Sequence, residues 1–354
     1  MELYIMNKSL ETVGVIDVFT SIIWTKRHFS AGDFELYLPA TAENIILLQA
    51  GNYICRSDDD RVMIIEKIII TTDAENGNFL TVSGRSLESI LARRIVWNLT
   101  VFVGYVEDFI RKLINENAIE PAVTNRKITN LILADKIGLE DRFLKQVTGD
   151  NLYEVIVEIC TTYKIGWKIT LNDNKQFVFS LYKGVDRSYN QSVNPYVIFS
   201  PEFDNLINSN YEKDTSTFSN VALVGGEGEG YNRKTQTVSL GSPKDLDRFE
   251  IFVDAGSLSS NSDSENPIDP TEYNNMLSEK GLEALSEKSI ITAFGGELET
   301  TSVYIYKNDW FVGDTVQIEN EYGMTATSQI LEVIESQDVS GYKVIPTFAE
   351  WEVN

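Results

Sequence analysis

Runs of alternating apolar and polar residues dominate the first hundred positions of the chain. Each run is rich in β-branched and aromatic residues and is bounded by turn-forming residues, which is typical of strands. Asn76-Gly77 predicts a tight hairpin, because both residues accept the positive φ angles that such a turn needs. A short helix is predicted at 86–94. Strands are expected at 13–19, 21–24, 34–38, 62–70 and 79–83, in a small barrel or sandwich.

From about residue 98 the hydrophobic period changes to that of an α-helix. Apolar residues share one helical stripe within 104–117, and a second amphipathic stripe covers 151–163. A hairpin is predicted where 167–171 faces 176–182. Helices and strands together indicate an α+β unit.

The pattern returns to strands from about residue 206. Segments 220–224 and 235–240 are predicted to pair across the glycine-rich turn 225–230. Asp269-Pro270 predicts the start of a helix that continues to Leu285, because proline suits the first helical turn. Strands resume after this helix, so it interrupts a β unit as an insertion. The first and third β regions resemble each other in pattern.

Charge is spread unevenly along the chain. The formal net charge is −23, and residues 241–354 hold six basic and 22 acidic residues, whereas 121–240 hold 13 and 14. The chain has no basic stripe of the kind that binds phosphates, so specific nucleic-acid binding is not expected. The acidic region indicates a solvated surface or, alternatively, a surface that repels a passing polyanion.

Other bulk features point to a protein folded in a cytosol. There is no apolar run long enough to span a membrane, and the first residues lack the pattern of a secretory signal. Cys55 and Cys160 are the only cysteines, and we expect two reduced, buried thiols.

No group of residues in the sequence indicates a catalytic site. His28 is the only histidine, and no Gly-x-Ser-x-Gly motif occurs, so a catalytic triad or a zinc site lacks residues; we expect an ordinary loop or strand-end histidine. Asp58–Asp60 lacks the alternating spacing of a calcium loop and indicates a solvated hairpin tip. The turn 225–230 lacks the register of a dinucleotide site, and its glutamates would repel a pyrophosphate.

Several segments, in their order along the chain, resemble the tail-hub family of siphophages, whose members are related to the central hub of contractile-tail baseplates. The glycine–glutamate turn within 220–230, followed by Arg233, is similar to a turn of that family. The resemblance covers nearly the whole chain. The other segments that carry it are 32–39, 64–68, 82–87, 312–316, Tyr322-Gly323, Ile330, Glu332-Val333 and 345–347.

The resemblance implies an α+β, mostly β fold with several domains. Two tube-like β-barrel domains are expected at 1–97 and at 206–240 with 295–347, an α+β domain at 98–205, and an inserted loop and helix domain at 241–294, with 348–354 as a C-terminal tail. The resemblance also implies a homotrimer. Two similar barrels per chain would give a pseudo-six-fold ring that matches a six-fold tail tube.

The function implied is that of a structural virion protein at the tail tip, assembled in the cytoplasm of the host. Such a hub joins the tail tube and distal tail ring to the tip fibre or spike, and it lines or closes the DNA channel. The tape-measure protein is a further candidate partner. The last barrel strand lies close to Asn354, so no lytic domain is expected, and neither is a membrane span.

The residues singled out are therefore scaffold residues in turns: Gly225, Gly226, Gly228, Gly230, Gly313 and Asp314. No catalytic, cofactor-binding or metal-binding residue is predicted. Two alternatives stay open. One is a carbohydrate-binding or adhesin module of the tail tip, favoured by 16 Tyr, 17 Phe and 5 Trp, with Trp310 as the candidate contact. The other is a cell-wall hydrolase, because 53 acidic residues guarantee carboxylate pairs by chance.

Overall fold

A computed structural model describes residues 1–354 except 76, 261–267, 298–302, 323–324, 350–351 and 354. Asn76 of the predicted hairpin, and parts of the predicted insertion, second β unit and C-terminal tail, lie outside the described residues. The chain is 40% strand and 21% helix, so the prediction of a mostly β, α+β fold is confirmed.

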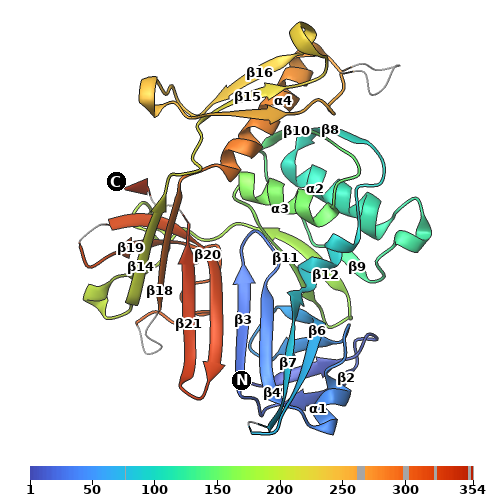
Figure 1. Ribbon diagram of the computed structural model, residues 1–354, viewed down its shortest axis with the longest axis vertical. Helices are drawn as coiled ribbons and strands as arrows, with labels where there is room; N and C mark the ends of the chain where they lie inside the picture. Colours follow the sequence, from blue (N-terminus) through green and yellow to red (C-terminus); the bar gives the residue numbers. More distant parts are fainter. Residues whose placement is uncertain (76, 261–267, 298–302, 323–324, 350–351, 354) are drawn as a thin grey trace.

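One large antiparallel sheet runs through both β-rich parts of the chain (Figure 1). Its strand order is β14-β18-β21-β20-β3-β4-β7-β6-β5-β1-β2. The bounds in the N-terminal part are β1 Leu3–Met6, β2 Thr12–Ile16, β3 Ser21–Arg27, β4 Asp33–Pro39, β5 Tyr53–Arg56, β6 Val62–Asp73 and β7 Gly77–Ser86. In the C-terminal part they are β14 Ile207–Asp214, β18 Ile291–Glu297, β20 Thr325–Asp338 and β21 Gly341–Phe348, with β13 Ile198–Phe199, β19 Thr315–Glu319 and β22 Glu352–Val353 attached.

Eight neighbouring strands of this sheet form two groups with the same connectivity. In chain order the first group is β3, β4, β6, β7, and its order in the sheet is β3-β4-β7-β6. The second group is β14, β18, β20, β21 in the chain and β14-β18-β21-β20 in the sheet. The third strand of the second group, β20, pairs with the first strand of the first group, β3. Hereafter these groups are the first and second β units.

No sheet formed by the described strands closes into a barrel, so the prediction of two barrels is not confirmed for a single chain. Both β units belong to one open sheet instead (Figure 1). The physical reason is that each unit contributes only four strands to this part of the sheet, too few to close on themselves. The edges of β20 and β3 satisfy each other's backbone groups.

Each β unit packs one face of its sheet against its own core. The largest fully buried side chains are Trp24 and Phe34 in the first unit, and Phe199, Trp310 and Phe348 beside the second. Burial of such large rings, together with the aliphatic side chains around them, stabilises these cores. The domain boundaries inferred from the sequence stay a prediction.

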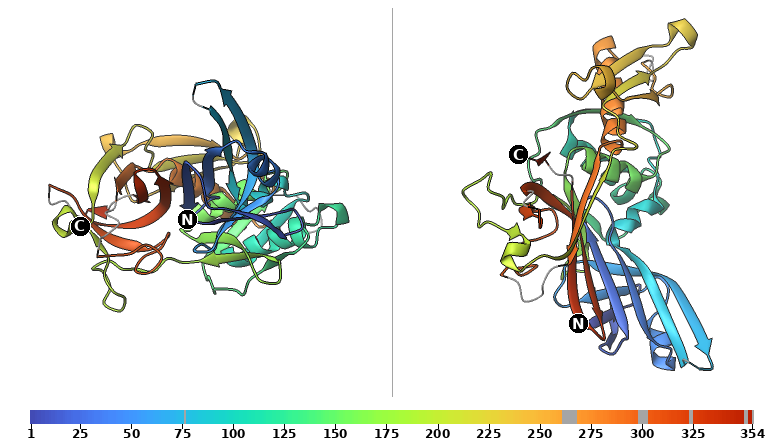
Figure 2. Two further views of the ribbon diagram at one scale, coloured as in Figure 1. Left: turned by 90° about the horizontal axis from the view of Figure 1, so that it is seen from below. Right: turned by 60° about the vertical axis from the view of Figure 1, so that its left-hand side comes forward.

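The α+β region lies at one end of the sheet, beside the first β unit (Figures 1 and 2). Asn151 begins its second helix as predicted, because its side chain accepts a hydrogen bond from the backbone N–H of Tyr153 at 3.0 Å. The helix predicted at 86–94 is a 3₁₀ helix. The bounds are η1 Leu87–Arg93, β8 Thr100–Tyr105, α2 Val106–Ile114, η2 Asn115–Ile119 (a π-helical turn), η3 Thr124–Arg126, β9 Leu131–Leu133, β10 Arg142–Val147, α3 Leu152–Thr162, β11 Gly166–Leu171 and β12 Phe177–Tyr182.

The insertion leaves the main sheet after β14 and returns at β18 (Figure 1). The predicted helix is confirmed, since Asp269 caps it by accepting a hydrogen bond from the N–H of Thr271 at 2.8 Å. The helix covers a small three-stranded sheet and buries Tyr273 and Leu277. Bounds are β15 Val221–Gly225, β16 Thr235–Ser239, β17 Glu250–Asp254 and α4 Pro270–Glu287, with the 3₁₀ turns η5 Gly230–Asn232 and η6 Asp245–Asp247. Elsewhere in the chain lie the short helix α1 Ala42–Leu47 and the 3₁₀ turn η4 Pro201–Phe203.

We expect Gly84→Ala to destabilise the protein by about 1–3 kcal/mol, as overpacking does. A Cβ atom at Gly84 would lie 1.8 Å from the carbonyl oxygen of Ile64, beside the irregular pairing between Ile65 and Lys67. Urea denaturation followed by tryptophan fluorescence measures the change. The neighbouring Ser83→Ala should shift stability by less than about 0.5 kcal/mol. Equal effects of the two substitutions would contradict the steric role given to Gly84.

Candidate functional site: the junction of the two β units

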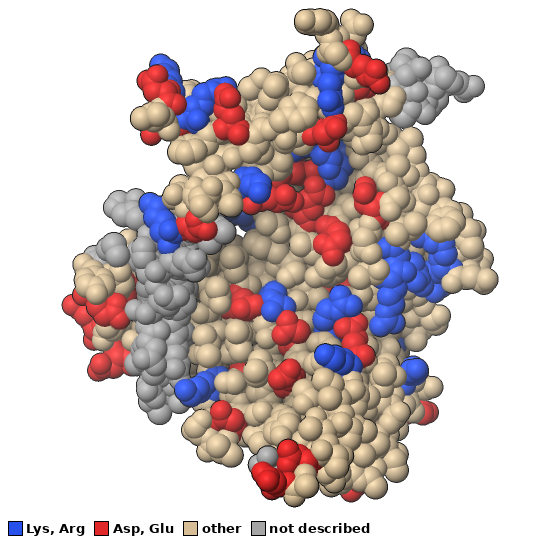
Figure 3. Space-filling view, viewed as in Figure 1, with Lys and Arg blue, Asp and Glu red and all other residues tan. Residues whose placement is uncertain are grey.

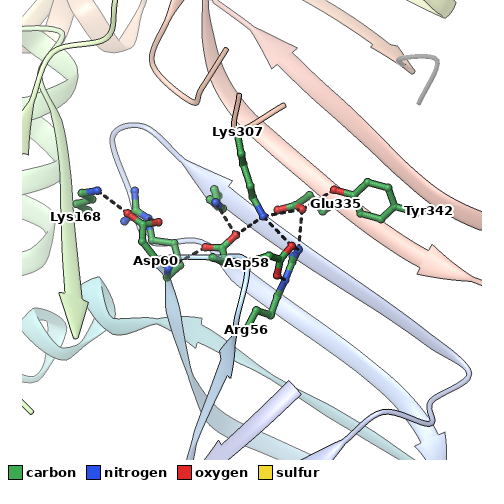
Figure 4. A network of polar contacts seen from close by, with 10 residues as sticks. Arg56, Asp58, Asp60, Lys168, Lys307, Glu335 and Tyr342 are labelled. Carbon is green, nitrogen blue, oxygen red and sulfur yellow. Dashed lines mark hydrogen bonds and ion pairs between the residues drawn. The ribbon is translucent and has the colours of Figure 1, made fainter. Parts of the chain in front are cut away.

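Polar side chains gather where β20 of the second β unit pairs with β3 of the first (Figure 4). The pairing runs from Glu332 opposite Arg27 to Gln337 opposite Ile22. Beside it, the turn between β5 and β6 brings a series of charged residues under the second unit. The junction thus combines backbone pairing with a network of ion pairs.

Glu335 of β20 is the buried centre of this network, with 0% of the residue exposed. Its Oε1 accepts hydrogen bonds from Arg56 at 2.9 Å, from Lys307 at 3.1 Å and from the hydroxyl of Tyr342 at 2.6 Å (Figure 4). Burial and the Glu335 carboxylate raise the pKa of Tyr342, so this hydroxyl stays a donor. A carboxylate is stable at such a depth only because cations and donors replace its water.

Asp59 is a second buried carboxylate, and its side chain is 0% exposed. Lys26 of β3 lies 2.6 Å from it and Lys307 lies 2.9 Å from it. Burial acts to raise the pKa of Asp59, but the two lysines hold it below its ordinary value. The prediction of a solvated hairpin tip is therefore wrong for Asp59, because two lysines distant in the sequence fold over the turn.

The flanking aspartates tie the same turn to other parts of the chain. Arg56 donates to both carboxylate oxygens of Asp58, at 2.9 and 2.6 Å. Asp60 accepts from Lys168 of β11 at 2.5 Å. Burial acts to raise the pKa of Asp60, but Arg61 and Lys168 lower it to about 2. One turn thereby contacts the first β unit, the second β unit and the α+β region.

His28 directly follows β3, as the prediction of a strand-end residue requires, but it is fully buried. The amide of Gln329 lies 3.3 Å from its Nε2, and the hydroxyl of Tyr182 lies 3.1 Å from its Nδ1. The Gln329 amide also donates to the carbonyl of Gly313, which fixes the amide nitrogen toward the ring. Burial, and then the positive charge of Arg61, lower the pKa of His28 to about 4. The ring is therefore neutral at pH 7.

Two glycines make room for this ring. A Cβ atom at Gly166 of β11 would lie 2.3 Å from Cε1 of His28, and one at Gly313 would lie 2.5 Å from it. Gly313 also has a φ angle of +95°. His28 thus marks the point where both β units and the α+β region meet.

The two predicted turns lie in different parts of the structure. Asp314 is buried at the junction, where it accepts from the N–H of Val185 at 2.8 Å and from Nε of Arg187 at 2.7 Å. Gly225 ends β15 of the insertion, and Gly226, Gly228 and Gly230 lie between β15 and β16, with φ angles of +97° at Gly228 and +54° at Gly230. The structure does not bring the two sets of residues together.

Sequence reasoning missed the charged residues that form the network. Arg56 is the last residue of β5, Glu88 lies in the 3₁₀ helix η1 and Glu335 lies in β20, and all three are buried. Arg61 forms an ion pair with Glu88, which also accepts from the backbone N–H of Ile169 at 3.2 Å. A charge that falls on the apolar face of a strand, as Arg56 follows Ile54 and Glu335 follows Val333, is the signal that could have found two of them, because such a charge needs a partner.

A second polar cluster joins α3 to α4 of the insertion. Lys145 contacts both Glu158 and Glu283, and Lys280 lies 2.9 Å from Glu283. Burial raises the pKa of Glu283, whereas the lysines and the neighbouring Glu283 lower that of Glu158 to about 2 against the effect of burial. Burial explains the raised pKa of Glu283, and contacts with its neighbours explain the lowered pKa of Glu158, so neither shift requires a catalytic role. A cleft of about 560 Å³ borders this cluster.

Little in the structure supports the two alternative functions, a carbohydrate-binding module and a cell-wall hydrolase. Trp310, the candidate sugar contact, is 0% exposed and packs against Phe199, so the expectation of an accessible ring is wrong. Within the described residues, no three His, Cys, Asp or Glu side chains are grouped as a metal site would require. Over the same residues, no helix is long and apolar enough to cross a membrane.

Comparisons with known proteins agree on the kind of protein. The family model described as Siphovirus ReqiPepy6 Gp37-like protein matches residues 2–348. No curated protein matches the chain. Among solved structures, a 43 kDa tail protein of prophage MuSo2 from Shewanella oneidensis has a TM-score of 0.61 at 11% identity, covering 99% of this chain and 98% of its own.

Two other solved structures share this fold, with similar TM-scores and sequence identities. The tail protein from Neisseria meningitidis MC58 has a TM-score of 0.58 at 12% identity, over 98% of this chain and 96% of its own. The prophage tail protein gp18 from Listeria monocytogenes EGD-e has a TM-score of 0.57 at 11% identity, over 98% and 94%. The three likenesses extend over the whole fold.

We expect Arg56→Ala to destabilise the chain by about 3–5 kcal/mol, because it leaves the buried Glu335 short of a cation. Chemical denaturation at pH 7 measures the loss. The control is Arg85→Ala, which removes an exposed pair with Glu66 and should cost less than about 1 kcal/mol. Similar losses in both variants would mean that the buried ion pairs contribute no more to stability than an exposed pair does.

Because His28 is buried and neutral, we expect the folded protein to lose stability in mild acid. Its pKa of about 4 in the folded chain is below the unfolded value of about 6.5, so the unfolded state takes up the proton first. Stability relative to a His28→Gln variant should therefore fall as the pH drops below about 6.5, by about 2 kcal/mol between pH 7 and pH 5. Paired denaturation curves at both pH values test this; a difference independent of pH would refute a neutral buried imidazole.

Proposed function

Since this chain belongs to the family of Siphovirus ReqiPepy6 Gp37-like proteins and is a structural protein of phage tails, we propose that it forms a homotrimeric hub at the tail tip. The hub joins the tail tube and distal tail ring to the tip fibre or spike and lines or closes the DNA channel. The role needs no catalysis.

The observation that carries this proposal is the repeated connectivity of the two β units. Within one chain, the third strand of the second unit (β20) pairs with the first strand of the first unit (β3). The same rule applied between copies pairs the third strand of the first unit (β6) with the first strand of the second unit (β14). Three chains would then present six similar units around a ring.

The strand edges that this ring requires are open. Among the described strands, β14 pairs only with β18. The first part of β6 pairs with β5 from Val62 to Ile64, but its second part, Lys67–Asp73, pairs only with β7 within the described part of the chain. On this second part Ile69 is 41% and Ile70 is 54% exposed. Open, apolar strand edges are unfavourable on a free surface and are commonly covered by another chain.

The directions of the strands fit the same ring. All neighbouring pairs from β14 to β6 are antiparallel, and the group has eight strands. With an even number of alternating strands, β6 of one copy and β14 of the next are also antiparallel. The contact between copies then repeats the geometry of the junction within the chain.

The face of the first β unit that is not packed on the core suits a channel that DNA must leave. Its arginines are paired with carboxylates: Arg27 lies 2.6 Å from Asp33 and 2.5 Å from Glu332, and Arg85 lies 2.8 Å from Glu66. Paired arginines offer few free cations to a phosphate backbone. This supports a lining that does not bind DNA during ejection.

We expect the wild-type chain to have a native mass of about three times 40.0 kDa in solution. Ile70→Lys in the open part of β6 should shift the mass toward that of the monomer, because a charge at a strand edge opposes pairing with another strand. Native mass spectrometry and sedimentation velocity measure this, with Ile46→Lys as control, since Ile46 is 72% exposed on α1. A wild-type chain that stays monomeric and is absent from tail tips in electron micrographs of virions would refute the hub.

A further inference from the structure

A second open strand edge lies in the α+β region, away from the main sheet. Strand β8 pairs with β10 along its whole length, and among the described strands it has no partner on its other side. Val101, Val103 and Tyr105 point to one face of β8 and are 39%, 58% and 38% exposed. The preceding Trp97 and Leu99 are 55% and 43% exposed, so apolar side chains continue along the same line. An open edge beside exposed apolar residues is a site for pairing with another chain.

A groove of about 460 Å³ runs beside the start of this strand. One wall is the segment Asn98–Val101, and the other is the end of α2 with the π-helical turn η2. Asn117 of that turn fixes the groove: its amide donates to the carbonyl of Leu113 at 2.9 Å, and its oxygen accepts from the N–H of Trp97 at 2.9 Å. Turns of this kind are frequent at functional sites. The groove is therefore held open by the fold.

The groove itself is lined by Lys112, Glu116 and Glu120, and four further cations are linked to it through Trp97. The guanidinium of Arg126 lies over the ring of Trp97, 4.6 Å from its centre. Arg94 donates to the carbonyl of Arg126, and Arg93 and Lys127 are their chain neighbours. None of these four cations forms an ion pair with a described residue, although the chain as a whole carries a net charge of −23. Burial and the neighbouring Arg126 and Arg93 lower the pKa of Arg94, so nearby charges leave it uncompensated. Figure 3 shows a group of Lys and Arg side chains on the right-hand side of the molecule.

We propose that β8 binds an extended segment of another protein chain as a third strand of the β10-β8 sheet. The segment has apolar residues at alternate positions, which cover Val101 and Val103, and carboxylates where it passes Arg93 and Lys127. This site is independent of the ring contact between β6 and β14.

Three features favour a protein segment over other anionic ligands. The unpaired backbone N–H and C=O groups of a strand edge are satisfied together only by another extended polypeptide. A polyphosphate would use the cations but leave the apolar face of β8 exposed. Tryptophan and arginine side by side are also typical of the energetic centres of protein interfaces.

The test begins with a displayed library of random twelve-residue peptides, selected on the full-length wild-type chain. Enriched peptides are synthesised with a fluorescent label, and Kd is measured by anisotropy. We expect alternating apolar residues with Asp or Glu, and a Kd that Val101→Lys with Val103→Lys weakens at least about tenfold. The matched control is Val13→Lys with Val15→Lys on the edge strand β2, where the valines are 44% and 49% exposed. This control should leave Kd unchanged.

A second pair of substitutions separates charge from shape. Arg93→Glu with Lys127→Glu should weaken binding about fivefold or more at low salt and have less effect at high salt. Hydrogen exchange on the complex should show new protection of β8 amides, a readout that a merely destabilised variant would not give. Thermal melting confirms that each variant folds.

Three results would overturn the proposal. One is a selection that yields no peptide sensitive to the β8 substitutions. The second is a set of enriched peptides that are basic, or whose binding protects amides elsewhere. The third is enrichment of sequences that match this chain itself, together with loss of self-association in the β8 variant, which would make a second copy the occupant.

Discussion

The pairing of β20 with β3 is the contact on which the rest of the structure depends. It joins two four-stranded units, distant in the sequence, into one sheet and fixes their register from Glu332 to Gln337. Backbone hydrogen bonds alone do not specify register strongly. The buried side chains of the two strands, Val333 and Trp24 among them, and the ion pairs of Glu335 supply that specificity, because a shift of one residue would turn them to the other face.

The cost of burying so many charges explains why the junction is built from several parts of the chain. Asp59 and Glu335 each need more than one cation, and those come from β3, β5 and the segment that holds Lys307. A neutral His28 then fills the remaining space between Gly166 and Gly313. Removing one partner would leave a charge or a cavity that the others cannot compensate. The relative placement of the two β units is therefore fixed by contacts from several parts of the chain.

The α+β region and the insertion add surfaces without changing the sheet. The insertion leaves and returns at adjacent strands, β14 and β18, so its length does not disturb their pairing. Its contact with α3 is largely made of ion pairs, and the edge of β8 stays open nearby.

The sequence by itself determined the local structure: the helices begun by Asn151 and Asp269, the strand segments, the mostly β class and the β15–β16 turn. Capping groups and turn residues act on neighbours only a few positions away, so their effect can be read from a short segment. Only the tertiary structure decided that the β units share one open sheet, that Asp59 is buried, and that Arg56 meets a glutamate 279 positions away. Pairing between distant strands uses backbone groups that every residue has, and a buried charge is recognised only once its partner is in place. Neither leaves a signature in the local pattern of side chains.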